Sequence, residues 1–243
     1  MNSYLMTDKG LARNNNQDDV LSVVKEDGDS LYVLCDGMGG HAGGAVACKK
    51  CINVFKNDFK KSKYENIDGA KEWLYKTILK ANKDIISAGN KDVSLKGMGT
   101  TVVCLLVSKD FKVYASVGDS RLYSYNKKHL TQISEDQTFA AALYKAGYIN
   151  KKEAMNHPRK SMLLCAVGSA PNGILDVQVK EITGNDNYLI CSDGLYNMVD
   201  DSKIKKILDE SISIKEKADK LIDEANENGG FDNISVILLE VNV

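Results

Sequence analysis

The stretch that decides the fold is Leu31-Tyr-Val-Leu-Cys-Asp36-Gly-Met-Gly-Gly-His41, in which an apolar run leads directly into an aspartate and a glycine-rich turn. The run is short and rich in residues that favour β-structure, so it predicts a buried strand. The sheet would hold Asp36 rigidly, and the glycines would let the chain turn sharply and leave backbone groups open to a ligand. Taken alone, an Asp-Gly pair after a strand is more typical of a simple turn.

The same placement recurs along the chain, because further aspartates stand at the ends of apolar runs. The full set is Asp18, Asp36, Asp119, Asp193 and Asp232. Burying several carboxylates close together is costly unless a positive group neutralises them. Hard divalent cations do this with oxygen ligands, so the set favours Mg²⁺ or Mn²⁺ over Zn²⁺. Two such ions close together can lower the pKa of a shared water and hold a phosphoryl oxygen.

Two other features bear on the same interpretation. Cys48 and Cys51 have the spacing of half a zinc site, but no second pair occurs, and a helical pattern around them favours thiols packed in a core. Arg13 stands shortly before Asp18 and offers the bidentate grip that a phosphate needs. Without that context Arg13 would be interpreted as an ordinary surface residue.

The composition is that of an ordinary globular protein. No linker rich in Pro, Gly or Ser divides the 243 residues, so we expect a single domain over 1–243. The formal net charge of −1 gives no general attraction to nucleic acid or to a membrane surface. Six cysteines behind an N-terminus unlike a signal peptide indicate a reducing, cytoplasmic location. No apolar run approaches the length of a membrane span, so we expect no membrane insertion.

Hydrophobic periodicity predicts strands and helices in separate blocks. Strands are expected over 19–25, 30–35, 102–107, 112–117, 122–125, 187–191 and 234–241. Helices are expected over 45–59, from a cap at Asp68 to a stop at Gly89, over 138–146, from Asn150 onward, over 201–210 and over 213–226. The short connections between strands require antiparallel pairing. These blocks predict an α+β fold with packed sheets and helices outside.

Six short motifs then occur in a fixed order. They are Arg13-Asn-Asn-Asn-Gln-Asp18, Asp36-Gly-Met-Gly-Gly-His41, Gly99-Thr-Thr101, Gly118-Asp-Ser-Arg121, Ser192-Asp-Gly-Leu195 and Gly230-Phe-Asp-Asn233. Together they resemble the metal-dependent serine/threonine phosphatases (PPM, type 2C), and most closely the small bacterial members that oppose membrane-anchored serine/threonine kinases. The resemblance runs from Thr7 to Val241.

This resemblance implies a four-layer α/β/β/α sandwich, with two mostly antiparallel sheets flanked by helices and two Mn²⁺ or Mg²⁺ ions in a cleft at one end. It implies that Asp36 bridges the ions and that the Gly37 carbonyl binds one of them. Asp193 and Asp232 would bind the other ion. Asp119, together with Asp193, matches the third-metal position of bacterial members.

The resemblance also implies roles around these ligands. Asp18 would hold metal-bound water, and Arg13 would bind the substrate phosphate. An irregular region of about 138–168 corresponds to a flap beside the cleft. Three hydroxyl side chains next to the ligands are expected to hydrogen-bond the carboxylates or the backbone; they are Thr100, Thr101 and Ser120. We expect Asn233 to position Asp232 or the adjoining turn. Residues of the flap, most of them basic, offer either a surface for acidic phosphopeptides or a solvated face; they are Lys145, Tyr148, Lys151, Lys152, Arg159 and Lys160.

The chain departs from the family pattern near the proposed chemistry. Met38 stands where many eukaryotic members have a histidine that is proposed as the general acid. Because Met38 carries no proton to donate, the leaving group would take one from metal-bound water, from His41 or from solvent. His41 fits a structural hydrogen-bonding role equally well. Gln137 replaces a frequent histidine, and Gln17 replaces a common glutamate. None of these changes removes an implied metal ligand.

The activity implied is hydrolysis of phosphoserine and phosphothreonine in proteins by direct attack of a metal-bridging hydroxide. The expected partners are phosphorylated proteins, including a serine/threonine kinase, and the expected state is a monomer. One alternative is a catalytically weak pseudophosphatase that binds or scaffolds phosphoproteins. Another is a metal-dependent nuclease or phosphodiesterase, which the lack of a basic composition disfavours.

Overall fold

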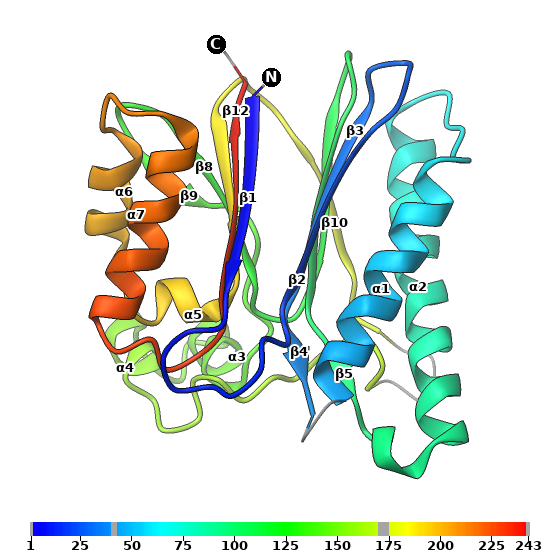
Figure 1. Cartoon of the computed structure of the whole chain (residues 1–243), viewed down its shortest axis with the longest axis horizontal. Helices are drawn as coiled ribbons and strands as arrows, with labels where there is room; N and C mark the ends of the chain where they lie inside the picture. Colours follow the sequence, from blue (N-terminus) through cyan, green and yellow to red (C-terminus); the bar gives the residue numbers. More distant parts are fainter. Residues whose placement is uncertain (1, 40–42, 170–174, 242–243) are drawn as a thin grey trace.

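The protein consists of four layers, in which two β-sheets lie face to face and helices cover the outer face of each (Figure 1). The computed structural model describes residues 2–39, 43–169 and 175–241. The first sheet contains, in spatial order, β1 (Asn2–Asp8), β12 (Ile234–Glu240), β11 (Asn187–Cys191), β8 (Arg121–Tyr125) and β9 (Leu130–Gln132). The second contains β10 (Gln178–Ile182), β7 (Lys112–Val117), β6 (Val102–Val107), β3 (Ser30–Cys35) and β2 (Asp19–Val24). Neighbouring strands pair antiparallel throughout both sheets, which confirms the predicted α+β sandwich.

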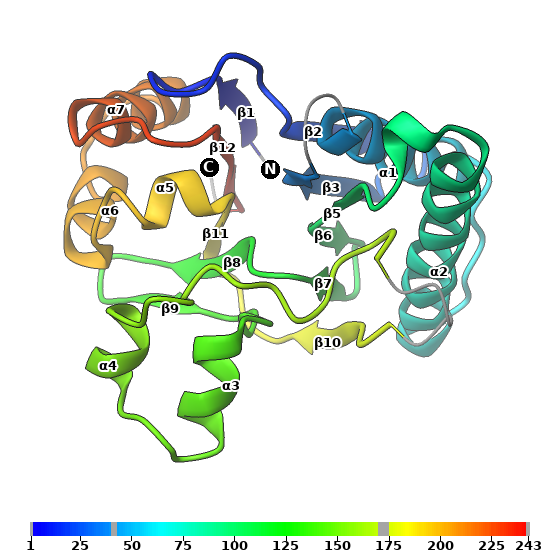
Figure 2. The same ribbon diagram turned by 90° about the horizontal axis from the view of Figure 1, so that it is seen from below.

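The long helices form the two outer layers. The second sheet is covered by α1 (Gly43–Phe59) and α2 (Ile67–Lys91), and the first by α6 (Asp201–Leu208) and α7 (Ile214–Glu227) (Figure 1). Short elements gather at the end of the sandwich away from the termini (Figures 1 and 2); they are β4 (Gly37–Met38), β5 (Gly99–Thr100), α3 (Phe139–Lys145), α4 (Lys151–Met155) and α5 (Asp193–Tyr196). A short 3₁₀ helix, η1 (Val93–Leu95), follows α2. In the described part of the chain, no helix has both the length and the apolar character needed to cross a membrane.

Strand β3 shows why the opening stretch is apolar at every position. Its side chains alternate between two faces, as in any strand. Leu31 and Val33 pack in the core beneath α1 and α2, whereas Tyr32 and Leu34 pack in the core between the two sheets. Both faces of the strand are therefore buried, and a continuous apolar run replaces the alternating pattern of a half-exposed strand. A third core lies between the first sheet and α5 to α7.

Most predicted elements are confirmed, with differences at helix ends and sheet edges. Asn66 caps α2, since its side chain accepts a hydrogen bond from the Gly69 N–H; the prediction of Asp68 as the cap was wrong. The helix also continues through the predicted stop at Gly89 to Lys91. The sequence missed β1, β9 and β10, which occupy the edges of the two sheets. Edge strands bury less apolar surface, so their sequences carry a weaker periodic signal.

Candidate active site

Antiparallel pairing in the second sheet brings the first two predicted aspartates together. Asp19, the first residue of β2, pairs with Cys35, the last residue of β3. Asp18 precedes this pair and Asp36 follows it, so both carboxylates stand at the same end of the sheet. That end is the one with the short elements, which Figure 2 shows face on. Strand register, a property of the whole sheet, thus sets the position of both acids.

The first sheet does the same for the other three aspartates. Cys191, the last residue of β11, pairs with the first residue of β8 and with Val236 of β12. Asp193 therefore follows β11 at the end where Asp119 precedes β8 and Asp232 precedes β12. A hydrogen bond of 2.7 Å from the Ser235 hydroxyl to Oδ2 of Asp18 links the two sheets at this end.

The carboxylates are close enough to perturb one another. Burial is the largest cause of the shift in each case, and it raises the pKa of Asp18 to about 7, that of Asp119 to about 7 and that of Asp193 to about 6. Burial also raises the pKa of Asp36 well above its ordinary value, and the charges of Asp18, Asp193 and Asp119 add to this rise. The negative charge of Asp232 raises the pKa of both Asp18 and Asp193. Five repelling acids in one place form an electrostatic site for cations.

The donor set fits hard divalent cations. Oδ1 of Asp18 is buried without a hydrogen-bond partner, although its Oδ2 is bonded to Ser235. An unpartnered buried carboxylate oxygen is unfavourable unless a water or an ion satisfies it. Among the described residues, no three Asp, Glu, His or Cys side chains are already arranged to hold a metal ion. Cation binding would therefore draw these oxygens closer together, and an all-oxygen set favours Mg²⁺ or Mn²⁺.

The backbone of Asp36 is fixed by hydroxyl side chains. The Asp36 N–H donates to the Thr101 hydroxyl (3.0 Å), and the Asp36 carbonyl accepts from the Thr101 N–H (2.8 Å) and the Thr100 hydroxyl (2.9 Å). The Thr101 hydroxyl also lies 2.7 Å from that of Ser120, near the turn that carries Asp119. The Thr100 and Thr101 hydroxyls therefore bond the backbone of Asp36, and Ser120 contacts it through Thr101.

Gly37 lies where no other residue fits. A Cβ atom at this position would be 2.6 Å from the carbonyl oxygens of Gln17 and Gly44, well inside van der Waals contact. The absence of a side chain therefore lets the start of α1 approach the chain just after Asp36. β4, which begins at Gly37, pairs with β5 and brings Met38 opposite Gly99. His41 lies outside the described residues.

The loop from β1 to β2 and the loop before β12 place Arg13 beside Asp232. The Arg13 guanidinium donates to Oδ2 of Asp232 at 2.8 Å, and the two side chains are 55% and 39% exposed. The buried Asn233 holds the loop that carries Arg13, because its amide accepts from the Gln17 N–H and donates to the Lys9 carbonyl, both at 2.8 Å. Asn233 thus positions both partners of the ion pair, as expected for a residue beside an implied ligand.

Several residues that the sequence did not single out hold the Asp119 turn. The Tyr196 hydroxyl donates to the Asp119 carbonyl at 3.0 Å. The Arg121 guanidinium stacks 3.5 Å from the centre of the Tyr196 ring and makes a bidentate ion pair with Asp136, with a shortest distance of 2.6 Å. Arg121 belongs to one of the six motifs, so its presence was a usable signal. Tyr196 and Asp136 belong to none of the six motifs, so one sequence gives no such signal for them.

Ser235 and Gln137 are two further residues that support the site. Ser235 lies inside the apolar strand β12, and a lone serine in a fully buried strand was a signal for a specific partner, here Asp18. Gln137 accepts from the Gly118 N–H (2.7 Å) and donates to the Asp176 carbonyl (2.8 Å). The glutamine that departs from the family pattern therefore supports the turn before Asp119.

The 138–168 region contains α3 and α4 and carries the predicted basic residues. The helix predicted from Asn150 onward is confirmed as α4, and Asn150 forms a capping box with Glu153 at its start. Lys145 pairs with Glu135 at 2.7 Å on the surface, as in a solvated face. Lys160 differs, because its charge reaches the site and, with Arg13, opposes the rise in the pKa of Asp193.

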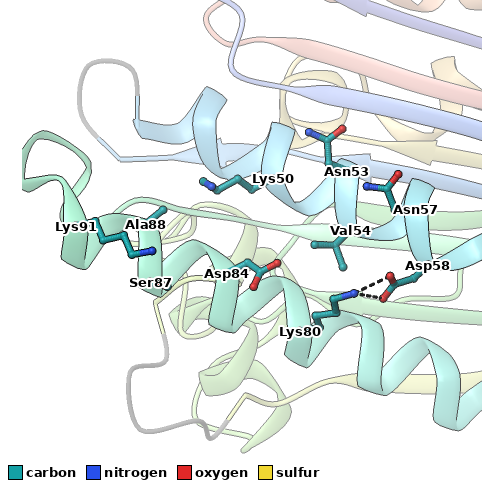
Figure 3. Close-up of a pocket in the computed structure, with 10 residues that line it drawn as sticks. All are labelled: Lys50, Asn53, Val54, Asn57, Asp58, Lys80, Asp84, Ser87, Ala88 and Lys91. Atoms are coloured by element: carbon teal, nitrogen blue, oxygen red, sulfur yellow. Dashed lines mark hydrogen bonds and ion pairs between the residues drawn. The ribbon is translucent and has the colours of Figure 1, made fainter.

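A separate groove of about 460 Å³ lies between α1 and α2 on the outer face of the molecule (Figure 3). Lys50, Lys80, Asp58 and Asp84 are among the residues that line it, and Lys80 is paired with Asp58 at 2.7 Å. None of the strand-end aspartates lines this groove. We therefore define the candidate site by the converging carboxylates and not by this groove.

Comparison with known proteins identifies the family. A family model for protein phosphatase 2C matches residues 11–226. The chain belongs to the protein phosphatase 2C family. The serine/threonine phosphatase stp of Listeria welshimeri is 37% identical over 244 residues, which cover 100% of this chain and 97% of that protein. The predicted family is thus confirmed, and the chain is a protein serine/threonine phosphatase of a metal-dependent family.

Solved structures agree with this assignment. The serine/threonine phosphatase Stp1 from Staphylococcus aureus has a TM-score of 0.92 and 33% identity, covering 99% of this chain and 95% of that one. The catalytic domain of the phosphatase PstP, solved in complex with two manganese ions, has a TM-score of 0.85 and 30% identity, covering 100% and 98%. These relatives are named as serine/threonine phosphatases, so the pseudophosphatase alternative is not favoured.

Proposed function

We propose that this phosphatase hydrolyses phosphoserine and phosphothreonine in proteins at a centre of two Mn²⁺ or Mg²⁺ ions. Asp36 and the Gly37 carbonyl would hold one ion, and Asp36, Asp193 and Asp232 the other. The observation that carries the proposal is the set of repelling carboxylates that both sheets bring to one end, with pKa values raised by burial. Bound ions would polarise the phosphoryl group and activate water for attack.

The residues of the chain then have separate tasks. The exposed Arg13 guanidinium binds the substrate phosphate in place of Asp232, as a planar, doubly donating group can. The unpartnered Oδ1 of Asp18 accepts a hydrogen bond from water and orients it toward the phosphorus. Water attacks the phosphorus in line while the bond from phosphorus to the serine or threonine oxygen breaks. That oxygen leaves and is protonated to the alcohol, inorganic phosphate is released, and no phosphoenzyme forms. Charge on the equatorial oxygens is stabilised by Arg13.

Asp119 would contribute, with Asp193, to a third cation position. Its support is the network of Tyr196 and Arg121, which fixes the Asp119 backbone while its carboxylate stays in the repelling set. The chain would act as one phosphatase unit, with 138–168 as its flap. Lys160 is the flap residue whose charge reaches Asp193, so it is well placed to face the bound phosphoprotein.

We propose phosphorylated proteins as partners, among them a serine/threonine kinase, and a monomer as the working state. A cytoplasmic location is supported by the six free thiols. Proteins are favoured over nucleic acid as substrates because the net charge is −1.

The experiment is dephosphorylation of a panel of phosphoproteins, including the serine/threonine kinase of the same cell, with Mn²⁺, Mg²⁺ or EDTA. We expect phosphate release from phosphoserine and phosphothreonine with either ion and none in EDTA. A bis-ester substrate serves as the comparison for phosphodiesterase chemistry. Release from the bis-ester but not from the phosphoproteins would overturn the proposal.

A further inference from the structure

Two apolar side chains lie exposed beside the Arg13–Asp232 ion pair. Leu11 is 70% exposed and stands two residues before Arg13; Phe231 is 63% exposed and directly precedes Asp232. Single exposed apolar residues are common on protein surfaces. Here, however, a leucine and a phenylalanine from loops far apart in sequence flank one ion pair, and that pair contains the residue proposed to bind phosphate.

The backbone holds these two loops together. The N–H groups of Leu11 and Ala12 both donate to the Gly230 carbonyl, at 2.8 and 3.0 Å. Both bonds meet at the carbonyl that directly precedes Phe231, and the Arg13–Asp232 ion pair joins the same two loops beyond Leu11 and Phe231. The positions of Leu11 and Phe231 relative to the ion pair are consequently set by main-chain hydrogen bonds.

The side chains themselves lie on a pair of glycines. A Cβ atom on Gly230 would be 3.0 Å from Cγ of Leu11, and one on Gly229 would be 2.5 Å from Cε2 of Phe231. Gly229 and Gly230 have φ values of +123° and +52°, a backbone conformation that favours glycine. Both apolar groups thus rest on bare main chain with one side turned to solvent. We call Leu11 and Phe231 the apolar ledge.

We propose that the apolar ledge binds an apolar side chain close to the phosphorylated serine or threonine, and so selects phosphoprotein segments with Leu, Ile, Val or Phe at that position. This inference rests on the proposed role of Arg13. An extended peptide advances about 3.3 Å per residue, so a phosphate on Arg13 places the residues next to it within reach of the ledge. Burying the exposed faces of Leu11 and Phe231 against an apolar partner removes apolar surface from water.

The test compares two phosphopeptides that differ only in the residues flanking one phosphothreonine, leucine in one and serine in the other. We expect wild-type enzyme to have a kcat/KM about 5- to 10-fold higher for the leucine peptide, less than the selectivity of an enclosed pocket. Phe231→Ser and Leu11→Ser should each reduce this ratio, and the double variant should bring it to about 1. The conservative Phe231→Leu should keep most of the ratio.

Val93→Ser is the matched control, since Val93 is 85% exposed on η1 and outside both loops; it should leave the ratio unchanged. A wild-type ratio near 1, or an equal loss on both peptides in Phe231→Ser, would overturn the inference. Because Leu11 and Phe231 come from separate loops, loss of folding in one variant still leaves the other as a test. Wild-type enzyme that hydrolyses neither peptide would instead refute the proposed function.

Discussion

The end of β3 and the loop of Arg13 both reach the candidate site, but they are held in very different ways. Asp36 continues a fully buried strand, and its N–H and carbonyl groups are bonded to Thr100 and Thr101. Arg13 lies in an exposed loop, and its guanidinium has an ion pair with Asp232 that is itself partly exposed. The rigid strand end suits a group that must hold a cation. The open loop suits a group that must exchange its partner for a substrate phosphate.

The largest loss of activity should come from removing a carboxylate at the end of a buried strand. Asp36→Asn or Asp193→Asn should lower kcat by at least about 100-fold, because one ligand charge is lost from the cation site. Phosphate release from a phosphoprotein with Mn²⁺ measures this. Asp110→Asn, a change at an exposed aspartate, is the control. If both site variants kept their activity, Asp36 and Asp193 would not be ligands of the catalytic cations.

The same variants should not destabilise the metal-free protein. The folded-state pKa of Asp36 is raised, so its charged form opposes folding at pH values above the ordinary carboxyl pKa. Asp36→Asn removes this penalty and should raise the melting temperature of EDTA-treated protein at pH 7, with the advantage shrinking as the pH falls toward 4. A scan of melting temperature against pH measures both. A large drop at pH 7 would show that Asp36 is needed for folding.

A smaller loss of activity should follow from substituting Arg13 in the exposed loop. Arg13→Ala should raise KM for phosphorylated proteins, with kcat/KM falling by about 10- to 100-fold for the loss of a charge-assisted bidentate contact. Arg13→Lys should recover only part of the lost kcat/KM, because an ammonium group cannot donate two parallel hydrogen bonds as a guanidinium does. Steady-state kinetics on one phosphoprotein measure both variants. An unchanged KM in Arg13→Ala would make Arg13 an ordinary surface residue.

Removing the Thr101 hydroxyl, which bonds the backbone of Asp36, should mainly lower the free energy of unfolding. Thr101→Val leaves the Asp36 N–H without its acceptor and the Ser120 hydroxyl without its neighbour, at a cost of about 1–3 kcal/mol. Thr101→Ser keeps the hydroxyl and should cost less. Urea unfolding of the two variants gives the comparison, and equal destabilisation of both would attribute the effect to packing.

The smallest change in stability is expected from a substitution at the surface of the 138–168 region. Lys145→Ala breaks an exposed ion pair with Glu135, which still pairs with Lys180, so stability at pH 7 should change by less than about 0.5 kcal/mol. The pKa of Glu135 is lowered to about 2, chiefly by its bonds to these lysines. The contribution of the pair is therefore present above the ordinary glutamate pKa and is lost as the pH falls toward 2. Urea unfolding at pH 7 and pH 3 measures it.

The buried strands and the aspartates at their ends were also the features that the sequence predicted best. Buried strands such as β3 have continuous apolar runs, and aspartates at their ends are visible in one sequence. Antiparallel pairing then brings such ends together without any further signal. The ordered motifs added the family resemblance, which pattern alone could not supply.

The sequence could not predict contacts that depend on side-chain directions in three dimensions. Tyr196 bonds the Asp119 carbonyl directly and Asp136 acts on this turn through Arg121, but both contacts depend on side-chain directions that one sequence does not reveal. The edge strands β1 and β10 were missed because most of their side chains are only partly buried, so polar residues interrupt the apolar pattern. The apolar ledge likewise appears only when the loops of Leu11 and Phe231 are placed side by side.

The measurement that tests the central claim most directly is a titration of EDTA-stripped enzyme with Mn²⁺, in which bound ions and phosphate release from a phosphothreonine protein are followed together. Asp193→Asn and the control Asp110→Asn are titrated in parallel. The account predicts that activity returns as two ions bind per chain, and that Asp193→Asn loses both tight binding and activity while Asp110→Asn keeps them. Full turnover in EDTA, or unchanged ion binding in Asp193→Asn, would contradict it.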